Sequence, residues 1–367
     1  MKQKVIISVI NDLSGDQRIH RIASTLAEAG NEVLVVGRKL PNSIPLSDRT
    51  YQTHRMRLFF IRGKWFYLEF NFRLFWFLLF RKADILNAND LDTLLANFLI
   101  SRIKGTRLIY DSHEYFTEVP ELIERPFTRN IWLRLEQWIF PQLNQIYTVN
   151  HSLASIYSQK YQKEVQVIRN VPFYKTGIKK EKKGKILIYQ GALNVGRGIE
   201  LMIRAMDYMP DITLWIIGRG DIEEALRKRA ESQKSSQQII FKGFIPLESL
   251  FEQTTEAYLG LSIEENLGDN YRFASPNKVY DYIQAGLPVL VSDLPEMRGL
   301  VEKYKVGEVL AETEREPEKF AARIKEILNN EEKYAHYQTH CLAAKEDLNW
   351  EKEREKLIRI YQNQKEL

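Results

Sequence analysis

The sequence predicts an α/β protein built from two Rossmann-like domains in tandem. Strand patterns alternate with helix patterns through the first half of the chain, and a second alternation of the same kind begins near residue 186. A charged stretch with few apolar residues, 176–185, separates the two. A chain of 367 residues with 44% hydrophobic content is long enough to bury two cores. We expect domains at 1–173 and 174–345, followed by a terminal helix at 346–367.

The first domain is expected to open on a strand at residues 4–9. A helical pattern runs from 19 to 29 and is stopped by Gly30. Further strands are expected at 32–36, 84–86, 107–110, 145–149 and 165–168, and further helices at 91–103, 131–143 and 153–161. This order is typical of a parallel sheet covered by helices.

The second domain repeats the alternation. Its strands are expected at 186–189, 213–217, 238–241, 257–262 and 288–292, and its helices at 199–206, 222–232, 247–254 and 295–303. One more helix lies between two of these strands: Ser275 can cap it, Pro276 suits its first position, and Gly286 suits its end.

The tail of the chain is helical in pattern from about residue 316. Near its end an apolar stripe is formed by Trp350, Leu357, Ile358 and Tyr361. The stripe is too short for a coiled coil, so we expect this helix to pack back across the first domain.

Composition and charge narrow the class of protein. The single cysteine, Cys341, excludes an internal disulfide framework and fits a reducing compartment. No run of 18 uncharged apolar residues occurs, so we expect a cytoplasmic protein without a membrane span. Residues 1–173 hold 23 Lys and Arg against 16 Asp and Glu, about +7, and the remainder holds 30 against 32, about −2. The basic first half fits a phosphate-rich or anionic lipid surface, or reflects chance asymmetry.

A glycine-rich turn follows the first strand of the second domain. It reads QGALNVGRGIE, in which Gly191, Gly196 and Gly198 permit close approach of a ligand to the backbone, and Arg197 stands just before a helix. Such a turn can cradle an anion, although glycines also simply make turns.

The helix that begins near Ser275 carries charge at its start. Asn277 and Lys278 fall in its first turn, where backbone N–H groups and the helix dipole favour an anion. Arg197 and Lys278 together can neutralise a diphosphate, and we assign both to catalysis. Asp281, one turn further, can accept hydrogen bonds from vicinal sugar hydroxyls, or is a surface aspartate.

The first domain offers two polar turns after strands. Gly15 lies in the turn after the first strand, and the segment YDSHEYF places His113 directly after another. A structural histidine bonded to a loop is the alternative for His113. The chain has no Walker A run, no Gly-x-Gly-x-x-Gly after its first strand and no Cys/His cluster, which speaks against a P-loop ATPase, a dinucleotide oxidoreductase and a zinc enzyme.

Taken together, these turns resemble those of family 4 glycosyltransferases with the GT-B fold. GALNVGRG matches the family's G-R-L-x-x-x-K-G, with Arg197 at its lysine and Ala192 at its arginine. WIIGRGD and FKGFIP match two further turns of the family. Residues 272–293 match its Glu-x7-Glu motif, in which Asp281 is the second acid and Phe273 replaces the first. DILNANDLDTLL resembles its His-x-His-Asp turn, with Asn87 and Asn89 at the histidines.

The resemblance implies two domains facing across a cleft that binds a nucleotide-sugar. It implies transfer of the sugar with retention at the anomeric carbon, no metal and no cofactor, to a glycan or lipid-linked acceptor. His113 would face the reacting sugar, Asp281 the ribose, and the backbone near Phe244 and Ile245 the base. The implied donor-binding residues are Gly15, Gly191, Gly218, Phe244, Ile245, Ser275, Asn277 and Asp281.

Alternative functions follow from the departures at Ala192 and Phe273. They keep open a catalytically inactive nucleotide-sugar-binding or scaffold protein in a glycan-assembly complex. A GT-B enzyme of another class, such as an epimerase or a phosphorylase, is a further alternative. Glu264, Glu265 and Asp269 are candidates to replace the acid that is missing at 273.

Residues 55–82 interleave aromatic and basic side chains. This pattern predicts either a surface that meets the inner face of the membrane, suited to a lipid-linked acceptor, or a core helix at 70–80 with basic ends. Nucleic acid is not an expected partner, because no recognised nucleic-acid module is present.

Overall fold

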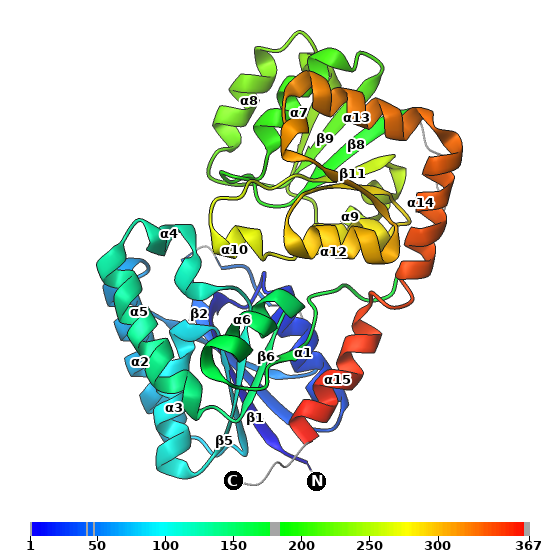
Figure 1. Cartoon of the computed structure of the whole chain (residues 1–367). Helices are drawn as coiled ribbons and strands as arrows, with labels where there is room; N and C mark the ends of the chain where they lie inside the picture. The colour runs from blue at the N-terminus through cyan, green and yellow to red at the C-terminus, as the bar shows by residue number, and fades with distance from the viewer. Residues whose placement is uncertain (1, 42, 47, 177–183, 363–367) are drawn as a thin grey trace. The chain divides into compact units, whose positions relative to one another are not determined.

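The chain folds into two compact units, each built on its own sheet. The computed structural model describes residues 2–41, 43–46, 48–176 and 184–362, so most of the expected linker at 176–185 lies outside the described residues. One unit comprises Met1–Asn170 with Glu353–Leu367, and the other comprises Val171–Lys352 (Figure 1). Two Rossmann-like units therefore confirm the predicted fold class.

The N-terminal unit contains a parallel sheet of seven strands in the order β3-β2-β1-β4-β5-β6-β7. Its strands are β1 (Lys4–Asp12), β2 (Glu32–Lys39), β3 (Gln52–Arg57), β4 (Ile85–Asn89), β5 (Arg107–Ser112), β6 (Gln145–Thr148) and β7 (Gln166–Val167). The strand order reverses between β1 and β4, where such folds place ligands at the carboxyl ends of strands. Strand β3 was not predicted, because this edge strand is polar and buries only Met56.

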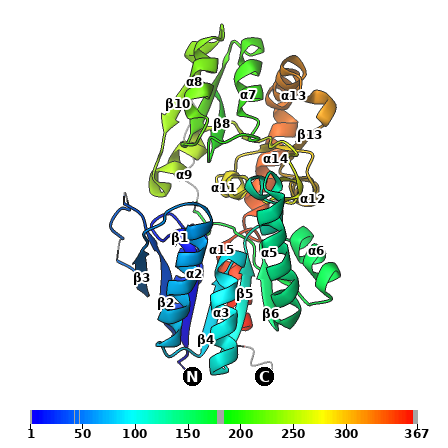
Figure 2. The same cartoon turned by 90° about the vertical axis from the view of Figure 1, so that its left-hand side faces the viewer.

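The helices of the N-terminal unit are α1 (Gln17–Glu28), α2 (Gly63–Leu79), α3 (Leu91–Lys104), α4 (Pro120–Ile123), α5 (Pro126–Ile139), α6 (His151–Tyr161) and α15 (Trp350–Gln362). Figure 2 shows α2, α3 and α5 side by side on one face of the sheet. Helix α5 begins five residues before the expected start at 131, because Pro126 supplies the preset φ that suits a first helical position.

The last helix, α15, returns to the N-terminal unit as predicted. Leu357, Ile360 and Tyr361 are buried on it. The Arg107 guanidinium donates hydrogen bonds to the carbonyl oxygens of Ile360 and Tyr361, which are left without partners where the helix ends. Ile358, which the predicted stripe included, is only half-buried.

The C-terminal unit contains six parallel strands in the order β10-β9-β8-β11-β12-β13. They are β8 (Lys185–Gln190), β9 (Ile212–Ile217), β10 (Ile239–Gly243), β11 (Leu259–Ser262), β12 (Val289–Ser292) and β13 (Gly307–Leu310). The order reverses between β8 and β11. The short edge strand β13 was not predicted, since GEVL carries too few residues for a period to show.

Helices cover both faces of this sheet and enclose a core on each. They are α7 (Ile199–Ala205), α8 (Glu223–Glu231), α9 (Leu247–Glu256), α10 (Asp269–Arg272), α11 (Asn277–Gln284), α12 (Pro295–Tyr304), α13 (Pro317–Asn329) and α14 (Glu331–Ala344). Ser275 was wrongly predicted to cap α11. Pro276, in an extended conformation, takes the cap position, and the Ser275 hydroxyl pairs instead with the Tyr280 hydroxyl at 2.7 Å.

Candidate functional site

Two cations meet a buried carboxylate at the switch point of the C-terminal unit. Arg197 lies in the turn after β8, and Lys278 lies in the first turn of α11. Glu264 follows β11, and its Oε1 atom accepts a hydrogen bond from Nζ of Lys278 and lies 3.9 Å from Nη1 of Arg197. Arg197 and Lys278 therefore lie beside the same carboxylate, and the predicted convergence of the two on a diphosphate stays a prediction.

The Glu264 carboxylate explains why a lysine can lie in the first turn of α11. Glu264 and Lys278 are both buried. Burial lowers the pKa of the Lys278 ammonium and alone would raise that of Glu264, but the Lys278 and Arg197 charges hold the pKa of Glu264 below its usual value. The cluster thus places two cationic side chains around one carboxylate.

The loop that carries Glu264 is fixed from two sides. The Ser262 hydroxyl donates to Oε2 of Glu264 at 2.8 Å. The Arg315 guanidinium donates to the backbone carbonyls of Ile263 at 2.9 Å and Glu264 at 3.2 Å. Arg315 was not predicted, because it stands in a turn after β13, 51 residues from Glu264 and in no motif.

Arg197 keeps donors available at this site. Its guanidinium lies 5.1 Å from the centroid of the Tyr271 ring on α10, and its buried Nε has no hydrogen-bond partner among the described residues. A buried N–H group without a partner is costly, and a ligand that accepts from it would remove that cost.

Asp281 is oriented by a polar chain that starts on α9. The Thr254 hydroxyl donates to Oε1 of Gln190 at 2.9 Å, and Nε2 of Gln190 donates to Oδ2 of Asp281 at 3.1 Å. Gln190 is the last residue of β8, so this chain fixes the half-buried Asp281 carboxylate at the carboxyl end of that strand.

Of the predicted glycine positions, Gly218 requires glycine and Gly15 does not. At Gly218, φ is +141°, and an added Cβ would lie 1.8 Å from the Gly191 carbonyl oxygen, so two backbones pack directly together there. At Gly15 an added Cβ would meet nothing within 4 Å. Backbone conformation and packing thus both require glycine at 218, whereas nothing in the described residues requires glycine at 15.

The remaining predicted donor-binding residues lie at the ends of β10 and α11. Phe244 follows β10 and is 67% exposed, while Ile245 packs partly against a core of the unit. Asn277 is exposed as the first residue of α11. The structure thus leaves Phe244 and Asn277 accessible to a ligand.

In the N-terminal unit His113 lies between two carboxylates. Its Nε2 lies 2.9 Å from Oδ2 of Asp111, and its Nδ1 lies 3.3 Å from Oδ2 of Asp90. The guanidinium of Arg18, on α1, holds both oxygens of Asp111 at 2.8 and 3.1 Å. The motif around His113 was found from the sequence, but the long-range partner Arg18 was not.

The charges of this cluster are coupled. Burial alone would raise the pKa of Asp111, but Arg18 and His113 lower it to about 2. Burial alone would lower the pKa of His113, but Asp111 and Asp90 raise it to about 9. His113 is therefore an imidazolium at neutral pH.

Strain and unmet polar atoms surround His113. Asp90 has a φ of +57°, which is uncommon outside glycine and often marks a functional site. Asn89 donates to the Ser8 carbonyl and to Asn87, so these two asparagines serve the sheet. Asp92 is buried with one oxygen unpartnered among the described residues, and burial with nearby Asp90 and Glu114 raises its pKa well above the usual value.

Family models match both halves of the chain. The model described as Glycosyl transferases group 1 matches residues 171–340, and the model described as Glycosyltransferase Family 4 matches residues 16–171. The chain belongs to the family 4 type of GT-B glycosyltransferases. Comparison with curated proteins gave no match.

Solved structures share the fold of this glycosyltransferase along its whole length. Sucrose-phosphate synthase from Thermosynechococcus elongatus is 17% identical with a TM-score of 0.79, and 98% of each chain is covered. Anabaena HepE, in complex with UDP and glucose, is 14% identical with a TM-score of 0.74, covering 98% of this chain and 99% of that one. WaaG, a glycosyltransferase involved in lipopolysaccharide biosynthesis, is 16% identical with a TM-score of 0.75, covering 98% and 100%.

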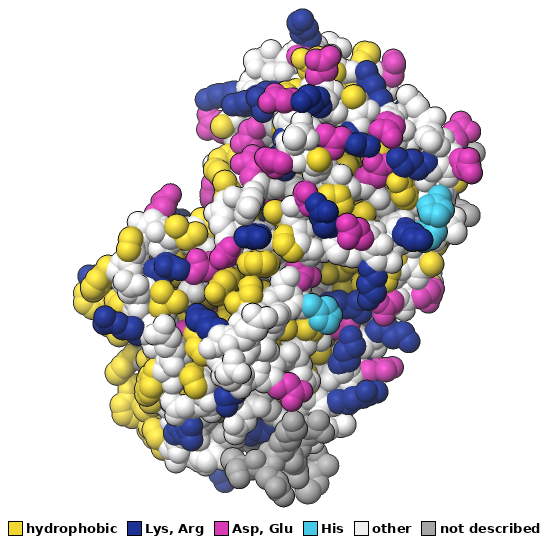
Figure 3. All heavy atoms as spheres, in the orientation of Figure 1, with side chains coloured by type: hydrophobic (Ala, Val, Ile, Leu, Met, Phe, Trp, Pro, Cys, Tyr) yellow, Lys and Arg dark blue, Asp and Glu magenta, His cyan; other side chains and the backbone are white. Residues whose placement is uncertain are grey.

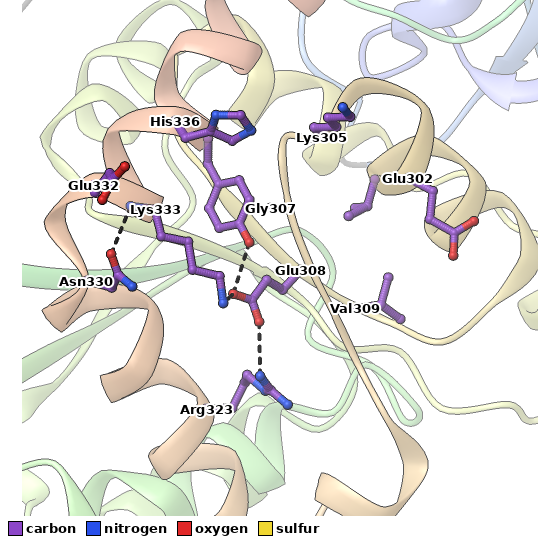
Figure 4. Close-up of a pocket in the computed structure, with 12 residues that line it drawn as sticks. Glu302, Lys305, Gly307, Glu308, Val309, Arg323, Asn330, Glu332, Lys333 and His336 are labelled. Carbon is purple, nitrogen blue, oxygen red and sulfur yellow. Dashed lines mark hydrogen bonds and ion pairs between the residues drawn. The ribbon is translucent and has the colours of Figure 1, made fainter.

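A broad surface hollow of the glycosyltransferase lies away from Arg197 and Lys278. It runs beside the edge strand β13 and the helix α14, and Figure 4 shows Arg323 and Lys333 turned toward Glu308. Glu308 pairs with Arg323 at 3.3 Å and with Lys333 at 2.5 Å, and it accepts from the Tyr337 hydroxyl at 3.1 Å. These groups already satisfy each other, so we do not place the site there.

Two further features of the glycosyltransferase concern metals and membranes. Within the described ranges, no group of three or more His, Cys, Asp or Glu side chains is arranged to hold a metal ion. Among the same residues, no helix is both long and apolar enough to cross a membrane.

Proposed function

We propose that this chain transfers a hexosyl group from a nucleoside diphosphate sugar to a glycan or lipid-linked acceptor, with retention at the anomeric carbon and without a metal ion. The observation that carries the proposal is the convergence of Arg197 and Lys278 on one point at the start of α11. The UDP held by HepE, a protein of the same fold, supports a nucleoside diphosphate as the ligand.

The proposed chemistry depends on the departing diphosphate. When the bond from the anomeric carbon to the diphosphate breaks, negative charge grows on the leaving oxygen and must be stabilised. The Lys278 ammonium has three N–H groups and gives one to Glu264. Its remaining donors and the Nε–H of Arg197 would bind the phosphate oxygens, and the amides of the first turn of α11 would add theirs.

Glu264 fixes the two cations rather than replacing the acid that is missing at Phe273. Its carboxylate is buried and bonded to Ser262 and Lys278. It would hold both cationic groups in place before the donor arrives, so that little reorganisation is needed during the reaction.

His113 is proposed to contact the reacting sugar as a hydrogen-bond donor and not as a general base. A group with a pKa of about 9 is already protonated at neutral pH and cannot accept a proton there. Asp281 is proposed to accept hydrogen bonds from the ribose hydroxyls, since Gln190 holds its carboxylate in a fixed orientation.

A screen of UDP-, GDP- and ADP-sugars for thermal stabilisation tests the donor class, because a ligand that binds only the native state raises the melting temperature. The stabilising donor is then incubated with and without EDTA. We expect slow release of nucleoside diphosphate in both, and an α-linked product from an α-linked donor. Activity that EDTA abolishes and Mn²⁺ or Mg²⁺ restores contradicts the metal-independent proposal.

A second candidate is a catalytically inactive nucleotide-sugar-binding protein. The observation that favours it is the loss of two customary side chains of the family, at Ala192 and Phe273. Binding of a sugar nucleotide with no release of diphosphate, in the presence of glycan and lipid-linked acceptors, would support this candidate over the enzyme.

A further inference from the structure

Helix α2 is apolar on both of its faces, but only one face is buried. Phe66, Phe70, Leu74 and Leu78, spaced four residues apart, pack into the core beneath the sheet. The opposite side carries large apolar residues that are exposed, namely Trp65, Leu68, Phe72 and Trp76. The core helix expected at 70–80 is therefore present, and the apolar outer stripe has no part in that core.

The exposed apolar residues continue onto α5. We call the α2–α5 face the surface formed by Phe59, Phe60, Ile61, Trp65, Leu68, Phe72, Trp76, Phe80, Phe127, Ile131 and Trp138. Helix α3 lies between α2 and α5 in Figure 2, and apolar side chains gather along this edge of the unit in Figure 3. Ring contacts tie the helices together, with Tyr67 of α2 against Trp132 of α5. Isolated apolar residues are normal on a protein surface, but a continuous patch marks an interaction site.

The same face is basic. Residues 57–82 contain six basic residues, Arg57, Arg62, Lys64, Arg73, Arg81 and Lys82, and one acid, Glu69. Glu69 is paired with Arg73 at 2.8 Å and accepts from the backbone amides of Phe59 and Phe60. No other carboxylate of this segment offsets the bases, so the segment carries a net charge of +5.

We propose that the α2–α5 face docks on a bilayer that contains anionic phospholipid. Tryptophan and phenylalanine side chains suit the boundary between headgroups and acyl chains, and lysine and arginine suit anionic headgroups. The Lys64 ammonium lies 5.4 Å from the centroid of the Trp65 ring, so cation and aromatic ring would enter the headgroup layer together. A second copy of this chain fits less well, because a two-fold contact would bring identical basic segments together.

Vesicle flotation tests docking directly, and its outcome does not depend on the proposed function. Full-length protein is mixed with vesicles of phosphatidylcholine alone or with added phosphatidylglycerol, at low and high salt. We expect strong binding only when phosphatidylglycerol is present, and weaker binding at high salt because surface charges are screened.

Two pairs of variants assign the binding to this face. Phe72→Ser with Trp76→Ser removes exposed rings and leaves the buried stripe intact, and Ile240→Ser, at an exposed site on β10, is its control. The second test variant is Arg62→Glu with Lys64→Glu. Its control is Arg229→Glu with Lys234→Glu on the C-terminal unit, which changes the net charge by the same amount. We expect the α2 variants to bind phosphatidylglycerol vesicles at least about tenfold more weakly, with controls unchanged.

Equal binding by the α2 variants and the wild type would overturn the proposal, as would an equal loss in the controls. Gel filtration of each variant shows whether it stays folded. A dimer that the Phe72→Ser and Trp76→Ser changes dissociate, in protein that does not float with vesicles, would overturn the proposal in favour of self-association.

Discussion

The Nζ atom of Lys278 lies 2.5 Å from Oε1 of Glu264, and both side chains are buried. A lysine in the first turn of a helix is opposed by the helix dipole, and this carboxylate compensates it. The Lys278 ammonium therefore has two roles: it compensates the buried Glu264 in the fold, and we propose that it binds the donor. Mutations can separate these two effects.

Lys278→Met alone should destabilise the protein more than Lys278→Met combined with Glu264→Gln does. The single change leaves Glu264 buried with the more distant Arg197 as its remaining counter-charge among the described residues, which typically costs about 3–5 kcal/mol of unfolding free energy. Adding Glu264→Gln should restore most of that stability. Neither variant should bind nucleoside diphosphate as tightly as the wild type. Denaturant unfolding measures the first effect and calorimetry the second, and a double variant as unstable as the single one would contradict the coupling.

Asp281→Ala should weaken binding of the nucleoside part of the ligand. A hydrogen bond to a charged group contributes about 1.5–3 kcal/mol, so we expect a loss of about 10- to 100-fold in affinity. Asp211→Ala, at an exposed acid before β9, is the matched control. Calorimetric titration with nucleoside monophosphate measures both, and an unchanged affinity for Asp281→Ala would show that this carboxylate faces something other than the ribose.

The stability of the N-terminal unit should depend on pH through His113. Its pKa is raised from an ordinary 6.5 to about 9 by folding, so its stabilising contribution is complete below pH 6.5 and is lost as pH rises through 9. The loss is on the order of 3 kcal/mol of unfolding free energy. Denaturant unfolding at pH 6 and at pH 9.5 should show this fall in the wild type. In His113→Gln the fall should be absent, and an equal fall there would assign the dependence to another group.

Alanine substitution should distinguish the two predicted glycine positions. Gly218→Ala places a Cβ 1.8 Å from the Gly191 carbonyl oxygen at a φ of +141°, so we expect a loss of several degrees in melting temperature. Gly15→Ala meets no atom within 4 Å and should change the unfolding free energy by less than about 0.5 kcal/mol. Thermal unfolding of both variants checks this. A stable Gly218→Ala protein would mean that the two turns can separate at little cost.

Local patterns predicted most of the fold. The periodicity of apolar residues predicted most strands of both sheets. Glycines predicted where helices end, and Gly286 follows α11 with a φ of +67°. The edge strand β3 escaped detection because it is polar, and Ser275 was misassigned because a serine before a proline looks like a cap. In both cases the tertiary environment, rather than local propensity, decided the outcome.

The candidate site was predictable only where its residues share a motif. Arg197, Lys278 and Asp281 were found because each stands in a glycine turn or a helix start. Glu264 could be named but not placed, because its position depends on the neighbouring ends of β8 and β11. Arg18 and Arg315 reach their partners from 93 and 51 residues away, and no local signal marks such distant contacts.

The most direct test of the account is calorimetric titration of the wild type and Arg197→Ala with the preferred nucleoside diphosphate and with the nucleoside alone. Arg204→Ala, at an exposed arginine on α7, is the control. If Arg197 and Lys278 bind the diphosphate, Arg197→Ala should lose about 10- to 100-fold in affinity for the diphosphate and nothing for the nucleoside. Equal affinity of Arg197→Ala and the wild type for the diphosphate would contradict the account.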